Sequence, residues 1–331
     1  MQKLNIAVVG ATGLIGRTML KILDEYSIPI GKLELFASTR SAGKTVEFQG
    51  KSYTVRELCP DEIAKAGALD FALFSAGGKA SRVFAPLFAA RGCTVIDNSS
   101  AWRMNPESPL VVPEVNPQAL RKPNNYIIAN PNCSTIQMTL PLKALSDAFG
   151  LHRVVVSTYQ SIAGAGQKGI DKLMHEIDGQ TDSALSSLPI AYNTIFHSFP
   201  VGADFTEEET KMINETRKIL ELPKLAITAT CVRLPILGGH GESLNVELEH
   251  DFSISEVVDV LGKFPNIVVM NGTTDGEYPT VKTCEGSDKV FVGRIRRDSS
   301  VERGLHLWVC GDNVRKGAAS NAVQILRLLT E

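Results

Sequence analysis

The stretch Ile6-Ala-Val-Val-Gly-Ala-Thr-Gly-Leu-Ile-Gly16 decides the fold of the first half of the chain. Its apolar run predicts a buried strand, and an amphipathic helix is expected directly after its glycines. Glycine permits a tight turn that a ligand can approach closely, and a helix N-terminus offers N–H groups to a pyrophosphate. Because the turn lies between a strand and a helix, we expect a dinucleotide site; the alternative is a bland glycine-rich turn. The contacts expected in this turn are Gly10, Ala11, Thr12, Gly13, Leu14, Ile15 and Gly16.

On both sides of this turn, over residues 1–132, short apolar runs alternate with stretches of helical periodicity. The expected strands are residues 4–9, 33–36, 71–74, 94–96 and 126–129, and the expected helices are residues 14–25 and 81–91. This alternation predicts a parallel sheet with helices on both faces, which is a doubly wound Rossmann-type domain of the α/β class over residues 1–132.

The residues after the second expected strand indicate NADP as the cofactor. A free ribose 2'-hydroxyl is usually bound by an acidic residue about 20 residues beyond the glycines. The sequence there reads Ser38-Thr-Arg-Ser-Ala-Gly-Lys44, and Arg40 and Ser41 suit a 2'-phosphate, unless Arg40 is simply solvated. The third strand ends on small residues that suit a strand beneath a flat cofactor, although a plain turn would look the same. The contacts expected there are Ser75, Ala76 and Gly77.

Length and composition set further bounds. The 331 residues predict about two domains, and the net charge of -2 provides no global basic field for nucleic acid. No apolar run reaches the roughly 18 residues that cross a bilayer, so we expect a soluble, cytoplasmic protein that binds no membrane. The 6 cysteines are scattered without a Cys-x-x-Cys pair, which argues against a metal site and against a disulfide framework.

The pattern changes after residue 132. The expected helices are residues 166–178 and 207–222, and the expected strands are residues 154–159, 226–234, 244–249, 267–270 and 290–296. We therefore expect a second domain of the α+β type with a mostly antiparallel sheet over residues 133–313. Residues 180–204 follow neither periodicity, which indicates a long connection or an insertion that contacts a partner. A last helix is expected over residues 314–329.

One cysteine has the surroundings of a nucleophile. In Asn130-Pro-Asn-Cys-Ser-Thr135 it directly follows an expected strand and begins an apolar helix. A helix N-terminus stabilises a thiolate, and its N–H groups can also hold an oxyanion. We therefore expect Cys133 to be the nucleophile and the other five cysteines to be buried and inert.

Two more motifs follow this one in a familiar order, namely Ser157-Thr-Tyr-Gln-Ser-Ile-Ala-Gly-Ala-Gly166 and Cys231-Val-Arg-Leu-Pro-Ile-Leu-Gly-Gly-His240. With them the chain resembles the aspartate-β-semialdehyde dehydrogenases, from the first glycine turn to Asp312-Asn-Val-Arg-Lys-Gly-Ala-Ala319. The resemblance implies that Cys133 attacks an aldehyde carbon, that hydride passes to NADP, and that inorganic phosphate cleaves the thioester. In cells the reaction is expected to run backwards, reducing aspartyl phosphate to aspartate semialdehyde for lysine, threonine and methionine.

The resemblance also implies roles for individual residues. His240, on a glycine-flanked loop after a strand, is expected to be the general acid and base, and Gln160 to orient the reacting group. The other histidines are expected to be ordinary surface or core residues; they are His152, His175, His197, His250 and His306. Further cofactor contacts are implied at Ser161, Gly164 and Asn313.

The substrate carries both signs of charge, and the resemblance assigns a residue to each charged group. Arg233 would bind the α-carboxylate, Glu208 the α-ammonium, and Arg103 and Lys211 the phosphate. Asn132 is implied as another substrate contact. Without the resemblance, Glu208 and Lys211 would be interpreted as a surface ion pair on one helical face.

The resemblance extends to assembly, and it leaves alternatives. It implies that the final helix, residues 314–331, returns to the first domain and that the chain pairs through its second domain as a homodimer or homotetramer. One alternative is a reductase for another acyl phosphate, such as N-acetylglutamyl phosphate or glyceraldehyde phosphate. The other is an inactive NADP-binding sensor.

Overall fold

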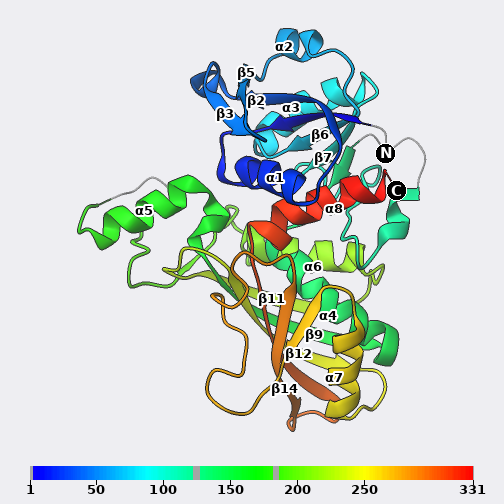
Figure 1. Ribbon diagram of the computed structural model, residues 1–331. Helices are drawn as coiled ribbons and strands as arrows, with labels where there is room; N and C mark the ends of the chain where they lie inside the picture. The colour runs from blue at the N-terminus through cyan, green and yellow to red at the C-terminus, as the bar shows by residue number, and fades with distance from the viewer. Residues whose placement is uncertain (1–2, 122–126, 182–185, 331) are drawn as a thin grey trace. The chain divides into compact units, whose positions relative to one another are not determined.

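The computed structural model describes residues 3–121, 127–181 and 186–330. The chain divides into two compact units (Figure 1), one formed by Met1–Pro131 with Ala318–Glu331 and the other by Asn132–Gly317. Tyr126, expected to begin a strand, and residues 182–185 of the expected connection lie outside the described residues, as does Glu331 at the end of the last expected helix.

The first unit is built on a six-stranded sheet in the order β5-β2-β1-β6-β7-β8, and every pair in it is parallel. Its strands are β1 Leu4–Val9, β2 Ile30–Ala37, β5 Arg56–Glu57, β6 Phe71–Phe74, β7 Thr94–Asp97 and β8 Ile127–Ala129. Its α-helices are α1 Leu14–Glu25, α2 Pro60–Lys65, α3 Gly78–Ala89 and α8 Ser320–Leu328, and a hairpin is formed by β3 Thr45–Phe48 and β4 Lys51–Thr54. The expected Rossmann-type fold is confirmed.

Alternate residues of β1 point into two separate cores. Ile6 and Val8 pack in one cluster with the apolar faces of α1 and α8, which lie side by side in Figure 1. Ala7 and Val9 pack in the other cluster with α2 and α3. This period of two in a continuous apolar run is typical of a strand that is buried on both faces.

The chain order of the strands reverses at β1, whose neighbours are β2 and β6. Ligands of such sheets bind beyond the strand ends at this point. Gly10 follows β1 with a φ of +87°, and a Cβ there would lie 2.4 Å from the carbonyl oxygen of Ser75. A Cβ on Gly16 would lie 2.2 Å from the carbonyl oxygen of Gly10, so only glycine lets α1 begin so close to the turn.

Replacing Gly10 by alanine should therefore destabilise the first unit by about 3 kcal/mol or more, because the backbone of Ser75 must move. Gly43→Ala is the matched control, since its φ is +80° but nothing lies within 4 Å of the added Cβ. The control should cost only the backbone term of about 1 kcal/mol. Urea unfolding measures both variants, and equal losses would contradict the close approach at Gly10.

The second unit is built on a seven-stranded mixed sheet in the order β10-β11-β9-β12-β15-β14-β13. Its strands are β9 Leu151–Gln160, β10 Ile195–Phe196, β11 Ala226–Arg233, β12 His240–Leu248, β13 Ile267–Met270, β14 Val290–Asp298 and β15 Gly304–Gly311. Only the pairs β11–β9 and β13–β14 are parallel, so the expectation of a mostly antiparallel sheet is confirmed.

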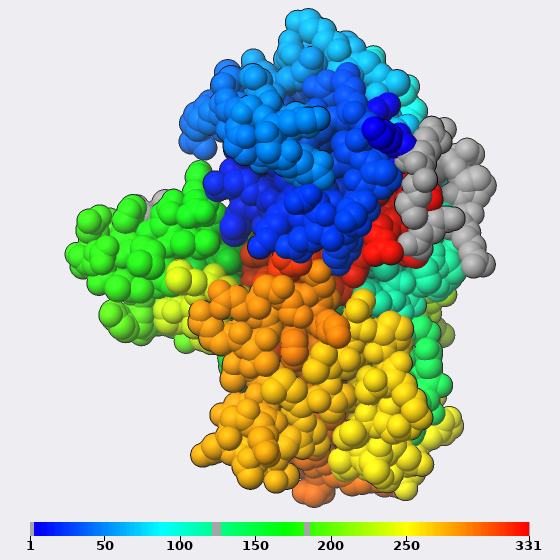
Figure 2. Space-filling model, viewed as in Figure 1, coloured from blue at the N-terminus to red at the C-terminus, as the bar shows by residue number. Residues whose placement is uncertain are grey.

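One layer of helices packs on this sheet. It consists of α4 Cys133–Phe149, α6 Glu207–Ile219 and α7 Ile254–Lys263, and α4 contacts both of the others. A further helix, α5 Gln167–Ile177, packs beside the short 3-10 turn Ile162–Ala165. The connection between β13 and β14, residues 271–289, lies largely at the surface of this unit and is drawn in orange in Figure 2.

Three details differ from the expectations. Residues 180–204 contain β10, which pairs with the edge of β11. His240 does not lie on a loop but is the first residue of β12. The glycine after it continues the strand against Trp308, since a Cβ on Gly241 would lie 2.5 Å from the Trp308 ring. The last helix is interrupted, since Arg315–Ala319 is π-helical before α8 begins.

Candidate active site

The ends of three neighbouring strands bring three of the expected residues together. β9 ends at Gln160, β11 ends at Arg233, and β12 begins at His240. In the sheet register Gln160 is paired with Arg233 on one side and with His240 on the other. Because β11 runs parallel to β9 and β12 runs antiparallel to it, two strand ends and one strand beginning meet at this edge of the sheet.

Cys133 lies at the N-terminus of α4, opposite His240. Its Sγ is 3.2 Å from the Nε2 of His240, so the imidazole can take the thiol proton directly. Asn132 caps the helix, and its Oδ1 accepts hydrogen bonds from the N–H groups of Ser134 at 3.0 Å and Thr135 at 3.3 Å. The expectation of oxyanion donors is therefore wrong for these two amides, which are already bonded to the cap.

The other ring nitrogen of His240 is placed between a donor and an acceptor. The N–H of Ser161 donates to Nδ1 at 3.0 Å, and the carbonyl oxygen of Gly239 lies 3.0 Å from the same atom. For Nε2 to accept the thiol proton, the neutral ring must carry its own proton on Nδ1, which then donates to the carbonyl oxygen of Gly239. Burial lowers the pKa of His240 to about 3, which keeps the ring neutral before substrate binds. A neutral ring beside the thiol is suited to act as a base.

Three expected cofactor contacts, Ser161, Gly164 and Asn313, surround this histidine. The Oδ1 of Asn313 accepts hydrogen bonds from the N–H of Gly239 at 3.0 Å and from the Oγ of Ser161 at 3.2 Å. A Cβ on Gly164 would lie 3.6 Å from the Nε2 of His240, so the backbone passes close to the ring. These residues position His240 in the second unit, whatever else they bind.

Four of the other cysteines do not compete with Cys133. Burial raises the pKa of the Cys93 and Cys284 thiols to about 12 and also raises the pKa values of Cys231 and Cys310. A thiol that remains protonated is a poor nucleophile. The expectation that these four are buried is confirmed, whereas Cys59 is only half-buried.

Glu208 stands at the centre of a hydrogen-bond network on α6. Its Oε1 accepts from the Nδ2 of Asn132 at 2.9 Å and from the Nε2 of Gln160 at 3.2 Å, and its Oε2 accepts from the Nζ of Lys211 at 3.3 Å. Burial alone would raise the pKa of Glu208, but Lys211 and these amides lower it to about 2. The carboxylate is therefore a fixed negative charge, and a surface ion pair is the wrong interpretation.

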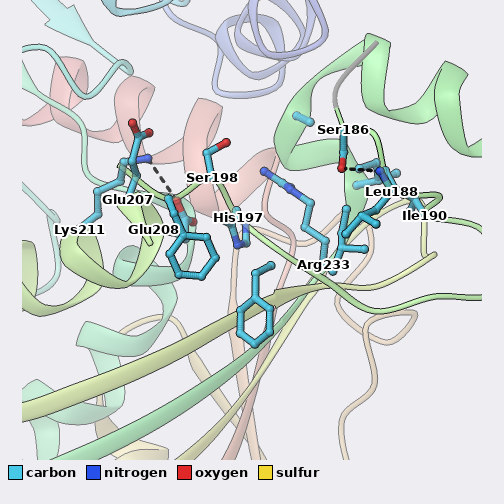
Figure 3. A pocket seen from close by; sticks show the side chains of 14 residues that line it. Ser186, Leu188, Ile190, His197, Ser198, Glu207, Glu208, Lys211 and Arg233 are labelled. Carbon is cyan, nitrogen blue, oxygen red and sulfur yellow. Dashed lines mark hydrogen bonds and ion pairs between the residues drawn. The ribbon is translucent and has the colours of Figure 1, made fainter. Parts of the chain in front are cut away.

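Glu208, Lys211 and Arg233 line a pocket of about 470 Å³ in the second unit (Figure 3). Arg233 is partly buried, and burial lowers the pKa of its guanidinium while the charges of Glu208 and Cys133 oppose this shift. The wall of the pocket thus offers a cation and an anion to a ligand that carries both charges.

The structure places the other expected residues in the first unit. The Nε of Arg103 donates to the carbonyl oxygen of Asn130 at 3.0 Å, and its Nη2 donates to that of Asn98 at 2.9 Å. The glycine turn, residues 10–16, contacts the end of β6 at Ser75. Arg40 is exposed and Ser41 is buried in the short turn after β2, which neighbours β1 in the sheet.

The structure adds a residue that supports the site. The Oε2 of Glu215 accepts a hydrogen bond at 2.7 Å from the N–H of Asn132, next to the nucleophile. It lies seven residues beyond Glu208 on α6, so both carboxylates point from one face of the helix toward the start of α4. Helical spacing of the two could have indicated this from the sequence.

The structure also shows an unused carboxyl group beneath the site. Glu242 is fully buried on β12, two residues beyond His240, and burial raises its pKa well above its ordinary value of 4.5. The side chain of Gln137 is near this carboxyl and opposes the shift, and its Nε2 donates to the carbonyl oxygen of His240 at 3.3 Å. Glu242 is therefore an acid group that the fold holds in its neutral form.

This burial predicts a pH-dependent stability. Between pH 4.5 and the raised pKa the folded chain keeps a proton on Glu242 that the unfolded chain loses, so stability falls as pH rises. Glu242→Gln replaces the ionisable carboxyl group by an amide that does not titrate. The free energy of unfolding of this variant should therefore rise relative to that of wild type by up to about 1.4 kcal/mol per pH unit. Urea unfolding from pH 5 to pH 8 checks this, and a difference that does not change with pH would contradict it.

Comparison with known proteins identifies the family. The family model described as the semialdehyde dehydrogenase NAD binding domain matches residues 5–123. The family model described as the semialdehyde dehydrogenase dimerisation domain matches residues 142–316. An aspartate-semialdehyde dehydrogenase of Aquifex aeolicus is 48% identical over 98% of both chains. The chain belongs to the aspartate-semialdehyde dehydrogenase family. It is accordingly an oxidoreductase with an NAD(P)-binding domain, and the resemblance seen in the sequence is confirmed.

Solved aspartate-semialdehyde dehydrogenases agree with this assignment. The structure of aspartate semialdehyde dehydrogenase II from Vibrio cholerae, complexed with ASA, is 44% identical and matches with a TM-score of 0.93 over 100% of this chain and 99% of that one. An enzyme with NADP from Candida albicans matches with a TM-score of 0.77 over 99% of both chains at 23% identity, which shows the shared fold. These relatives do not support the alternative of an N-acetylglutamyl phosphate reductase.

The described residues contain neither a candidate membrane span nor a candidate metal site. Within residues 3–121, 127–181 and 186–330, no helix is both long and apolar enough to span a bilayer. The same ranges contain no group of three His, Cys, Asp or Glu side chains arranged to hold a metal ion.

Proposed function

We propose that this chain reduces L-aspartyl 4-phosphate to L-aspartate 4-semialdehyde and inorganic phosphate, reversibly and with NADP, through a thioester on Cys133. The observation that carries the proposal is the 3.2 Å contact between the Cys133 Sγ and the His240 Nε2 at a helix N-terminus. Lysine, threonine and methionine biosynthesis, which the sequence resemblance implies, needs the reaction in this direction.

The thiol and the imidazole divide the reaction between them. Written toward the acyl phosphate, His240 takes the thiol proton, the Cys133 sulfur forms a bond to the aldehyde carbon, and His240 gives the proton to the aldehyde oxygen, which makes a hemithioacetal. His240 next takes the hydroxyl proton of the hemithioacetal as hydride passes from its carbon to the oxidised cofactor and the thioester forms. Inorganic phosphate then bonds to the thioester carbon, and the sulfur departs as a thiolate. Gln160, fixed by Ser134 and Glu208, is placed to orient the reacting carbonyl group.

Binding of the substrate uses the fixed charges of the pocket. The guanidinium of Arg233 suits the α-carboxylate, and the carboxylate of Glu208 suits the α-ammonium. Lys211 and Arg103 are the cations proposed for the phosphate group, and Asn132 is proposed as a further contact. The network around Glu208 keeps Glu208, Asn132 and Lys211 in place before the substrate arrives, which lowers the cost of ordering them.

The glycine turn of the first unit supports the proposal of a dinucleotide cofactor. A Cβ would fill the cradle at Gly10 and Gly16, and α1 begins with neither a side-chain cap nor an acidic residue in its first turn. A pyrophosphate fits there, next to Ser75 and the small residues that follow it. When bound, the nicotinamide donates or accepts the hydride.

The 2'-phosphate has several candidate cations. Arg40 and Ser41 remain our proposal from the sequence. A pocket of about 690 Å³ in the same unit is also lined by Thr12, Arg17 and Lys44, and it does not include Arg40. Lys21 lines this pocket as well, and none of these three cations was proposed from the sequence.

We assign cofactor binding to the first unit and substrate binding with dimerisation to the second. The chain is proposed to act as a homodimer or homotetramer. All six cysteines are free among the described residues, and a reactive thiol suits a reducing compartment, so we place the reaction in the cytoplasm.

The test is nicotinamide absorbance with aspartate semialdehyde, NADP and inorganic phosphate, each omitted in turn. We expect steady NADPH formation only with all three. Turnover of N-acetylglutamate semialdehyde in place of aspartate semialdehyde would transfer the proposal to the acetylated substrate. Absence of turnover with either aldehyde, together with NADP binding by fluorescence, would contradict a catalytic role.

A further inference from the structure

Two complementary atoms in the pocket wall are left without partners. In the part of the chain that the structure describes, neither the Nε2 of His197 nor the Nη1 of Arg233 has a hydrogen-bond partner, although both atoms are buried. His197 lines the same pocket as Glu208 and Arg233, and its side chain is drawn between theirs in Figure 3. A buried polar atom without a hydrogen-bond partner is costly in free energy. Two such atoms at one pocket therefore indicate that a ligand forms the missing hydrogen bonds.

The position of His197 follows from the short strand β10. Ile195 is paired with Arg233 and Phe196 with Val232, so His197 continues along the edge of β11. Ile195 is buried, Phe196 is exposed and His197 is buried again, with an exposed fraction of 9%. This alternation turns the imidazole inward to the pocket.

The contacts of His197 determine which ring nitrogen carries the proton. Its Nδ1 lies 3.3 Å from the carbonyl oxygen of Cys231, and a carbonyl only accepts, so Nδ1 is the donor. Burial first, and then the neighbouring charge of Arg233, lower the pKa of His197 to about 4. The ring is therefore neutral near pH 7, and Nε2 presents a lone pair.

We propose that the Nε2 of His197 accepts a hydrogen bond from the α-ammonium of the substrate, so that His197 and Glu208 together recognise the amino group. This inference rests on the proposed function. The unpartnered Nη1 of Arg233 is a donor and matches the α-carboxylate, whereas the Nε2 of His197 is an acceptor and matches the ammonium. His197 is thus a specificity-determining residue, and the expectation of an ordinary core histidine is replaced by this role.

The experiment compares two substrates and two variants. Succinic semialdehyde is aspartate semialdehyde with hydrogen in place of the amino group. His197→Asn retains an amide donor near the position of Nδ1 but has no atom at that of Nε2, whereas His197→Gln places an amide at the position of Nε2. The measured quantity is kcat/KM for aspartate semialdehyde divided by kcat/KM for succinic semialdehyde, with NADP and phosphate saturating.

We expect wild type to prefer aspartate semialdehyde and His197→Asn to lose about ten- to a hundredfold of this preference, as for one hydrogen bond to a charged group. His197→Gln should keep the preference within about threefold, and kcat/KM for succinic semialdehyde should change little in both variants. A preference that survives in His197→Asn, or equal losses on both substrates, would assign His197 a purely structural role.

Two controls keep the outcomes separate. Wild type that does not distinguish the two aldehydes would overturn the inference without any variant, should the variants fail to fold. Absence of wild-type turnover on aspartate semialdehyde would instead refute the proposed function. Turnover with an unchanged preference in His197→Asn refutes only the role of His197.

Discussion

Replacing Cys133 by serine is expected to lower turnover by about 10⁴-fold or more, because a serine hydroxyl stays protonated where a thiol ionises. The change removes little packing, since serine is only slightly smaller than cysteine, and the cap of α4 depends on Asn132 instead. The melting temperature should therefore stay close to that of wild type. Steady-state rates with aspartate semialdehyde, NADP and phosphate measure the effect.

Cys59→Ser is the matched control, because Cys59 is a partly accessible thiol in the first unit. This variant should keep wild-type activity, and iodoacetamide should inactivate it as fast as wild type. If Cys133→Ser retained more than a few per cent of the wild-type rate, the thioester mechanism would be wrong.

Replacing His240 by glutamine should lower kcat by about 10² to 10⁴, the contribution typical of a positioned acid and base. An amide can still accept a hydrogen bond from the Cys133 thiol, but it cannot take the proton. KM for aspartate semialdehyde should change much less than kcat, because the charges of Arg233 and Glu208 that bind the substrate remain. The measurement is kcat and KM from steady-state rates, with aspartate semialdehyde, phosphate and NADP each varied in turn.

His250→Gln provides the comparison, since His250 is an exposed histidine two residues beyond the end of β12. It should have no effect on kcat. An unchanged kcat in His240→Gln, or a loss confined to KM, would contradict the assignment of His240 as acid and base and leave it a binding role.

The first unit could be predicted almost in full from the sequence, because each of its elements carries a local signal. The strand Leu4–Val9 and the helix Leu14–Glu25 have the expected bounds, since an uninterrupted apolar run and a glycine turn mark their ends. The second unit was harder. The strand β15 was not expected, although its apolar residues between two glycines carry a strand signal, and its pairing with β12 and β14 is long-range.

The helix α7 was also not expected from the sequence, for a different reason. Its sequence is rich in β-branched residues, which favour strands, and its helical signal lies in the capping box formed by Ser253 and Glu256. The amphipathic packing of α7 on β13 and β14 then decides its conformation. Tertiary contacts thus outweigh the local preference.

The site was predictable where motifs mark it and not elsewhere. Cys133 and His240 stand in distinctive stretches, and the structure brings them to 3.2 Å. The roles of Glu215 and His197 depend on which face of α6 and of β10 turns inward, which is set by packing between distant segments. A lone histidine in the sequence gives no indication of such contacts, and for Glu215 the available signal is its helical spacing from Glu208.

The central claim is the thioester on Cys133, and a single-turnover measurement tests it most directly. Enzyme is mixed with aspartate semialdehyde and NADP without phosphate, and NADPH is followed by stopped flow while the protein is analysed by mass spectrometry. We predict a burst of about one NADPH per site, an aspartyl group on the peptide that contains Cys133, and its release when phosphate is added. NADPH formation without a protein-bound acyl group, or a burst that does not depend on Cys133, would contradict the account.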